Sequence, residues 1–141
     1  MNNSCSIIID VLVNNPIEKV WHFWSAPEHI TKWNFASDEW ECPAVENDFR
    51  AGGKFSYVMA AKDGSAEFNF EGIYTKIEQY DRIEYVLDDQ RKVSVKFISE
   101  DSGTRIIESF EAEGSNCDEQ QRLGWQAILE NFKKYAERNH E

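Results

Sequence analysis

The sequence is poor in the residues that build metal centres and disulfide frameworks. Its 141 residues include only 3 cysteines and 3 histidines. No C-x-x-C pair occurs, and the histidines do not combine with the cysteines at the spacing of a zinc site. Three widely separated cysteines are also not typical of a disulfide framework. We therefore predict a protein with no bound metal and no cofactor.

Positive charge and long apolar runs are also scarce. The 15 lysines and arginines are outnumbered by 26 aspartates and glutamates, which gives a net charge of -11. A field of that sign repels phosphate backbones and anionic lipid, so we expect no nucleic-acid partner. The N-terminal segment, MNNSCSIIIDVLV, has no basic region, and its apolar run is too short to span a bilayer. These features predict a cytoplasmic protein that does not insert into membranes.

Glycine and proline are few, at 7 and 3, and no repeat, low-complexity tract or linker interrupts the chain. We therefore predict one domain over residues 1–141, a length that can bury a core. Aromatic residues, in contrast, are abundant, at 13% of the chain with 5 tryptophans. This excess suggests that the rings do more than fill a core.

The N-terminal third has the pattern of one strand followed by two short helices. Residues 6–13, SIIIDVLV, are rich in β-branched residues, as strands are. Asn15 is the expected N-cap of the first helix, with Pro16 at its first position and Glu18 three residues after the cap. Pro27 opens a second short helix that ends near Trp33.

Residues 40–111 alternate between apolar and polar side chains, and turn signals divide them into antiparallel strands. Asp63-Gly64 predicts a two-residue hairpin loop with positive φ. The facing pairs set by this loop are Phe55–Gly72, Tyr57–Phe70 and Met59–Phe68. The facing pairs set by a turn at residues 101–103 are Val93–Phe110, Val95–Glu108, Phe97–Ile106 and Ser99–Thr104. A three-residue loop in DDQRK brings residues 83, 85 and 87 to the same face, and Ile77, out of phase with Tyr74, indicates a β-bulge.

The last element, about residues 118–138, has helical spacing. Its apolar stripe consists of Trp125, Ile128, Leu129, Phe132 and Ala136. At 1.5 Å per residue the helix is about 30 Å long, enough to cross a small sheet. The order of elements predicts an α+β fold in which this helix lies over one face of an antiparallel sheet.

Four segments, in this order, resemble the START-like (SRPBCC) superfamily. Residues 14–33, NNPIEKVWHFWSAPEHITKW, resemble its opening pattern of prolines, valine and tryptophans. Residues 48–55, DFRAGGKF, resemble a segment of the branch that contains homologues of a heat-shock-protein ATPase activator. Residues 70–86, FEGIYTKIEQYDRIEYV, and residues 124–135, GWQAILENFKKY, extend the similarity over nearly the whole chain. The resemblance implies a helix-grip fold, in which a strongly bent antiparallel sheet wraps around the long C-terminal helix.

The resemblance also implies a hydrophobic cavity between the sheet and the helix. Members of the superfamily use it to bind lipids, sterols, plant hormones, flavonoids or polyketides. One eukaryotic branch instead stimulates a chaperone ATPase, and there the domain follows a separate chaperone-binding domain, for which we expect no room in 141 residues. A hydrophobic small molecule is therefore the favoured partner, and a chaperone is the weaker alternative.

Inward-facing rings are the candidate walls of this cavity. Phe68 and Phe110 are assigned to a solid core, but buried tyrosines each need a hydrogen-bond partner. Several tyrosines on one concave face favour a ligand-sized cavity, while Trp24 and two further tryptophans are placed near its entrance, with core packing as the default. The predicted ligand-binding residues are Trp33, Trp40, Phe55, Tyr57, Phe70, Tyr74, Tyr85, Val95, Glu108, Trp125 and Ile128.

Glu108 is the most specific of these predictions. Ile106 and Phe110 must point inward, so the alternation of the strand carries Glu108 inward too. An unpaired buried carboxylate costs several kcal/mol, so it must be paired, protonated or open to a wet cavity. Two interpretations stay open: a structural ion pair, with Arg91 as a candidate partner, and a polar anchor that orients a hydroxyl or amine of a ligand.

The remaining motifs support no further site. Gly52 and Gly53 are interpreted as a backbone bend. His22 and His29 lie on separate predicted helices with no nearby acid or nucleophile motif, and both are interpreted as surface residues. No nucleophile with an adjacent base is recognisable.

Three functions follow in order of preference: a binding protein for an aromatic or lipid-like molecule, a polyketide aromatase/cyclase-type enzyme with Glu108 or a tyrosine as acid or base, and a chaperone-activator-like interaction module. A binding protein is favoured over an enzyme.

Overall fold

The computed structural model describes residues 6–112 and 119–138. In chain order the elements are β1 (Ser6–Val13), α1 (Ile17–Ser25), α2 (Pro27–Ile30), β2 (Trp40–Asn47), β3 (Lys54–Ala61), β4 (Glu67–Glu78), β5 (Arg82–Leu87), β6 (Lys92–Glu100), β7 (Gly103–Glu111) and α3 (Glu119–Arg138). The strands of this part of the chain form one antiparallel sheet in the order β1-β7-β6-β5-β4-β3-β2.

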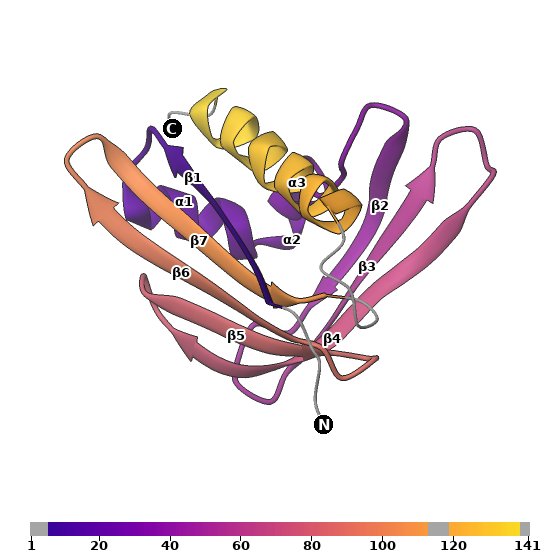
Figure 1. Cartoon of the computed structure of the whole chain (residues 1–141), viewed down its shortest axis with the longest axis horizontal. Coiled ribbons are helices and arrows are strands. Elements are labelled where there is room, and N and C mark those ends of the chain that lie inside the picture. The colour runs from indigo at the N-terminus through magenta and orange to yellow at the C-terminus, as the bar shows by residue number, and fades with distance from the viewer. Residues whose placement is uncertain (1–5, 113–118, 139–141) are drawn as a thin grey trace.

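The sheet curls around α3, and the hairpins of β2, β3 and β4 flare away from the helix (Figure 1). The helices α1 and α2 lie beside α3 within the curl (Figure 1). This arrangement confirms the predicted α+β helix-grip fold. None of the described helices has both the length and the apolar character that a bilayer span requires.

Side chains of α3 donate hydrogen bonds to backbone carbonyls of β1 that no other strand pairs with, because β1 is an edge strand of the sheet. The three hydrogen bonds run from Arg122 Nη1 to Ile8 O (3.1 Å), from Gln126 Nε2 to Asp10 O (3.2 Å) and from Lys133 Nζ to Leu12 O (2.6 Å). Open carbonyls on an edge strand are a template for pairing with another chain. The three bonds cover this edge and also fix the position of α3 along β1.

The start of α1 differs from the prediction. Pro16, and not Asn15, is the N-cap, and no side chain caps this end of the helix. Asn15 is buried and donates through Nδ2 to the backbone oxygen of Ala136 at 2.9 Å. Its side chain therefore connects the start of α1 with the last turn of α3. The second helix begins at Pro27 as predicted.

The predicted registers of both hairpins are confirmed. The pairs in β3–β4 include Phe55–Gly72, Tyr57–Phe70 and Met59–Phe68, and those in β6–β7 include Val93–Phe110, Val95–Glu108, Phe97–Ile106 and Ser99–Thr104. The first turn is wider than predicted, because the N–H of Gly64 donates to the oxygen of Ala61 at 3.0 Å. Only Gly64 of the predicted Asp63-Gly64 pair has a positive φ.

The remaining sheet features also follow the prediction. The N–H of Leu87 donates to the oxygen of Arg91 at 2.8 Å, which closes the three-residue loop between β5 and β6. The register between β4 and β5 shifts between Tyr74 and Lys76, which is the expected bulge. All side chains of β5 that were expected on the inner face are buried.

The core occupies the part of the curl nearest β1. Leu129, Phe132 and Ala136 of α3 are fully buried there, and the ring of Phe132 meets that of Trp33 edge-on at 4.8 Å. Phe110 is 1% exposed, as expected of a core residue, whereas Phe68 is 51% exposed. The assignment of Phe68 to a solid core was wrong, because its register position lies on the flared end of β4, next to the hairpin turn.

Gly72 of β4 lies beneath the ring of Phe55, which belongs to β3. A Cβ atom built on it would lie 2.6 Å from the backbone oxygen of Val86 and 2.8 Å from Phe55 Cζ. Both distances are shorter than a carbon side-chain atom tolerates, so the strand or the ring would have to shift. The absence of a side chain at this position therefore allows the Phe55 ring to cover the backbone.

We predict that Gly72→Ala lowers the free energy of unfolding by roughly 1–3 kcal/mol because of this overlap. Urea unfolding followed by circular dichroism measures the effect. Gly124→Ala is the matched control, since a Cβ on this α3 residue meets nothing within 4 Å. The control should raise the stability by up to about 1 kcal/mol through helix propensity. Similar changes in both variants would contradict the packing argument.

Candidate functional site

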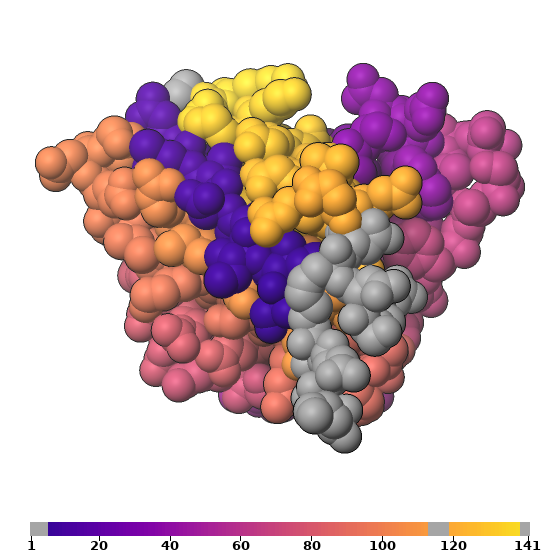
Figure 2. All heavy atoms as spheres, viewed as in Figure 1, coloured from indigo at the N-terminus to yellow at the C-terminus, as the bar shows by residue number. Residues whose placement is uncertain are grey.

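A cavity of about 270 Å³ lies between α3 and the inner face of the sheet. The molecular surface is hollowed between α3 and the start of β2 (Figure 2). Among the predicted ligand-binding residues, those that line the cavity are Trp33, Phe55, Tyr57, Phe70, Tyr85, Glu108, Trp125 and Ile128. The sheet register and the helical stripe thus bring residues that lie up to 95 positions apart in the chain to one space.

Three of the predicted residues do not line the cavity. Val95 is fully buried in the core beside it, and Tyr74 is buried with its hydroxyl donating to Asn47 Oδ1 at 2.5 Å. Trp40 is half-buried, and its ring meets the exposed ring of Phe68 at 5.9 Å. A side chain that points to the inner face of the sheet therefore does not always line the cavity, because neighbouring rings cover some of these inward positions.

Aromatic rings form most of the cavity wall. Phe55 is at the centre of the sheet side, with ring centroids 5.2 Å from Tyr57 and 5.0 Å from Tyr85. On the helix side, the Trp125 ring meets Phe70 at 5.9 Å and stacks on a buried phenylalanine of β7 at 3.9 Å. Such contacts hold the rings in fixed positions around the open volume. The rings of the wall therefore support one another around the open volume.

Glu108 provides a carboxyl group at one end of this apolar space. It is 6% exposed, and burial raises its pKa from 4.5 to about 8. No basic nitrogen of the described chain lies within 4.0 Å of its carboxylate, and Arg91 instead pairs through Nε with Asp89 at 2.8 Å. The structure therefore contains no ion pair between Glu108 and Arg91. At neutral pH the carboxyl is mainly protonated and can donate as well as accept a hydrogen bond.

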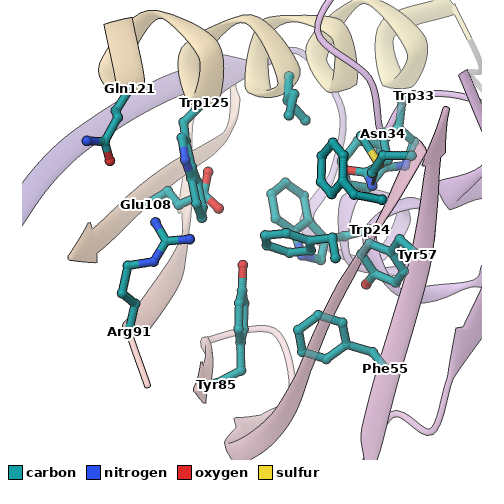
Figure 3. Close-up of a pocket in the computed structure, with 14 residues that line it drawn as sticks. Trp24, Trp33, Asn34, Phe55, Tyr57, Tyr85, Arg91, Glu108, Gln121 and Trp125 are labelled. Carbon is teal, nitrogen blue, oxygen red and sulfur yellow. Dashed lines mark hydrogen bonds between the residues drawn. The ribbon is translucent and has the colours of Figure 1, made fainter. Parts of the chain in front are cut away.

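Tyr85 and Arg91 point toward the same end of the cavity as Glu108 (Figure 3). Burial, followed by the nearby Glu108 carboxyl, raises the pKa of Tyr85 well above its ordinary value, so its hydroxyl stays protonated. Neither Tyr85 nor Glu108 has a hydrogen bond to another described residue. Because no fully enclosed side-chain oxygen lacks a partner in this part of the chain, both groups face open cavity space.

Several lining residues were not predicted as ligand-binding. These are Trp24, Asn34, Met59, Phe68, Arg91 and Gln121. The hairpin register already placed Met59 and Phe68 on the inner face. Asn34 follows α2 with no periodic pattern, yet it is buried and donates through Nδ2 to Met59 Sδ at 3.3 Å. Gln121 lies on the first turn of α3, outside the apolar stripe that identified this helix. No local sequence pattern identifies Asn34 or Gln121 as a residue that lines the cavity.

His22 and His29 lie outside the cavity and on separate helices, as predicted, but their rings are close together and an acidic side chain lies beside them. Their ring centroids are 5.0 Å apart, and Glu28 is their neighbour. His29 is half-buried, and its Nδ1 forms a hydrogen bond of 2.5 Å with the Tyr135 hydroxyl. The corner between α1 and α2 brings the histidines together, although seven positions separate them in the chain.

Comparison with known proteins finds solved structures of similar length and fold. The sequence profile of the family "Activator of Hsp90 ATPase homolog 1-like protein" matches residues 14–137. An AHSA1-like protein from Aeromonas hydrophila is 43% identical, with 97% of this chain and 99% of that chain covered and a TM-score of 0.88. Chr148 from Cytophaga hutchinsonii is 47% identical, with 98% of this chain and 94% of that chain covered and a TM-score of 0.78. None of the curated proteins compared matches this chain.

The raised pKa of Glu108 predicts a pH-dependent loss of stability. Between its unfolded value of 4.5 and its folded value of about 8, the folded protein binds a proton that the unfolded chain has released. The free energy of unfolding therefore falls as pH rises through this interval. Glu108→Gln removes the titration, so its stability relative to the parent should increase from pH 5 to pH 9, by up to about 4–5 kcal/mol.

Urea unfolding at a series of pH values tests this, with Glu67→Gln as the control because Glu67 is an exposed carboxylate on β4. The control reports the effect of losing one exposed carboxylate charge. If the curve for Glu108→Gln ran parallel to that of the control, Glu108 would not carry a raised pKa.

Proposed function

Since the chain belongs to the family of Activator of Hsp90 ATPase homolog 1-like proteins, whose fold commonly contains a ligand-binding cavity, we propose that it binds a small apolar molecule in the cavity beneath α3. The ligand class that fits best is one or two aromatic rings, or a short acyl chain, with one polar oxygen. The observation that carries the proposal is a pair of polar groups, Glu108 and Tyr85, that have no hydrogen-bond partner among the described residues and lie in a cavity walled mostly by rings.

The size of the cavity supports this ligand class. A dry cavity of about 150 Å³ is enough to bind benzene, and drug-sized ligands occupy sites of about 300–1,000 Å³. The volume of about 270 Å³ therefore suits a molecule of one or two rings. A sterol or a long acyl chain would require the flared hairpins to move away from α3.

The polar end supports an oxygen on the ligand. Glu108 in its protonated form, the Tyr85 hydroxyl and the Arg91 guanidinium are all hydrogen-bond donors. Three donors at one end of an apolar space favour a ligand that carries an acceptor, such as a carbonyl, carboxylate or hydroxyl oxygen. Burying donors without partners is costly, so such an oxygen gains more from this site than a plain hydrocarbon does.

An enzyme of the aromatase/cyclase type is the second candidate, because the pKa of Glu108 is about 8. A carboxyl that titrates near neutral pH can take and return a proton during a reaction. The two candidates differ in the effect of Glu108→Gln. For a binding protein the substitution changes affinity alone, whereas for an enzyme it abolishes turnover of a poly-β-keto substrate analogue with binding retained.

We predict that 2-naphthol and 2-naphthoate bind roughly tenfold more tightly than naphthalene, because they supply an acceptor for the polar end. Two-dimensional NMR titration should shift the Trp125 indole signal and the ring signals of Phe70 and Tyr85. The Trp21 indole serves as the internal control, since its ring packs against Phe49 and other rings outside the cavity lining. In Glu108→Gln and Tyr85→Phe the preference for the oxygenated compounds should decrease.

A cavity-filling variant provides the second arm of the experiment. Ile128→Phe adds volume on the cavity wall and should weaken naphthoate binding by about tenfold or more. Ile73→Phe adds the same volume at an exposed position of β4 and should leave affinity unchanged. If none of the compounds moved the cavity signals, while the protein stimulated the ATPase of a purified Hsp90, the chaperone-activator function would replace the one proposed.

A further inference from the structure

Three side chains of the types that can ligate metals lie together at the corner between α1 and α2. They are His22 near the end of α1 and Glu28 and His29 in α2, and one ligand atom of each lies within 4.8 Å of the other two. His22 and Glu28 are exposed, and His29 is half-buried. None of the three lines the cavity, so this cluster is independent of the proposed ligand site.

The His29 ring is held in a fixed orientation. Its Nδ1 forms the hydrogen bond of 2.5 Å with the Tyr135 hydroxyl of α3. The ring also packs edge-on against Phe23, with centroids 4.9 Å apart. Histidines that bind metals typically use one ring nitrogen as the ligand while the other is held by a hydrogen bond. With Nδ1 engaged by Tyr135, Nε2 of His29 is the nitrogen left to act as a ligand.

In contrast to the expectation from the sequence that no metal is bound, we propose that His22, Glu28 and His29 bind a divalent transition-metal ion of the zinc class. Two imidazole nitrogens and one carboxylate oxygen are a donor set that zinc uses in three-ligand sites, with water in the fourth position. The set contains no thiolate and only one carboxylate, which favours zinc, cobalt or nickel over copper(I) or calcium.

The donor atoms need only a small rearrangement to meet one ion. In a tetrahedral site with bonds of about 2.0–2.1 Å, ligand atoms are about 3.4 Å apart. Separations of up to 4.8 Å between the ligand atoms therefore have to shorten by up to about 1.4 Å. His22 and Glu28 are exposed and make no side-chain hydrogen bond with another described residue, so rotation of these two side chains supplies the movement. His29, held by Tyr135, serves as the fixed point.

The bound ion would add a further connection among the three helices. It would connect α1 to α2 directly and α3 through the bond between His29 and Tyr135. Tyr135 is a positioning residue, because it sets the ring orientation without touching the metal. Its loss should reduce metal affinity while the fold persists.

The experiment uses untagged full-length protein with the substitutions Cys5→Ser, Cys117→Ser and His140→Ala. These remove the thiols and the imidazole that lie outside the described residues and could bind metal themselves. The third cysteine, Cys42, is buried. Cobalt(II) titration followed by visible absorption reports ligand geometry, and zinc competition gives the affinity. We expect one ion per chain, with the intense d–d bands of a tetrahedral site.

Single substitutions then assign the ligands. His22→Ala and His29→Ala should abolish the tetrahedral cobalt spectrum, and Glu28→Gln should weaken binding, whereas the control Glu18→Gln, an exposed carboxylate in the first turn of α1, should not. Tyr135→Phe should weaken zinc binding about tenfold or more, with an unchanged unfolding midpoint in EDTA. The proposal is overturned if the background protein binds no cobalt, or if binding survives in the His22→Ala/His29→Ala double variant.

Discussion

The attachment of α3 to the free edge of β1 determines which part of the space inside the sheet is filled by the core and which part remains as a cavity. Side chains of Arg122, Gln126 and Lys133 bond to backbone oxygens of the edge strand, so the helix is held on the β1 side of the curl. Leu129 and Phe132 then fill that side as core. The sheet continues to curl beyond the reach of the helix, and the rings of β3 and β4 face the volume that α3 does not occupy. The cavity is a consequence of this offset between helix and sheet.

Strand alternation explains why a carboxyl group lies inside an apolar space. The register that buries the neighbours of Glu108 on β7 leaves this side chain no other direction, and pairing with Val95 places it beside the cavity. No described cation neutralises it, so burial raises its pKa to about 8, and we expect stability to fall as pH rises toward that value. Groups retained at such a cost are common where a protein binds or transforms another molecule.

Features set by local chemistry could be predicted from the sequence, and features set by distant contacts could not. β-Branched runs, turn residues and alternation determined the strands, both registers and the inward direction of Glu108. Asn15 has the pattern of an N-cap, but a carbonyl of Ala136, 121 positions away, binds its side chain instead. The approach of His22 to His29 depends in the same way on the angle between two helices. Phe68 faces the expected side, but it is exposed because it lies on the flared end of β4, and no strand pattern encodes that flare.

The offset of α3 also separates the residues that hold the fold from those that shape the cavity. The bonds to β1 and the buried face of α3 lie on one side, while Phe55, Phe70 and Tyr85 lie on strands that the helix does not grip. Substitutions among these rings would alter the shape and polarity of the cavity while the anchor of α3 stays intact. One scaffold could therefore diverge toward many ligands over evolution, and the same positions are where a designer would alter selectivity first.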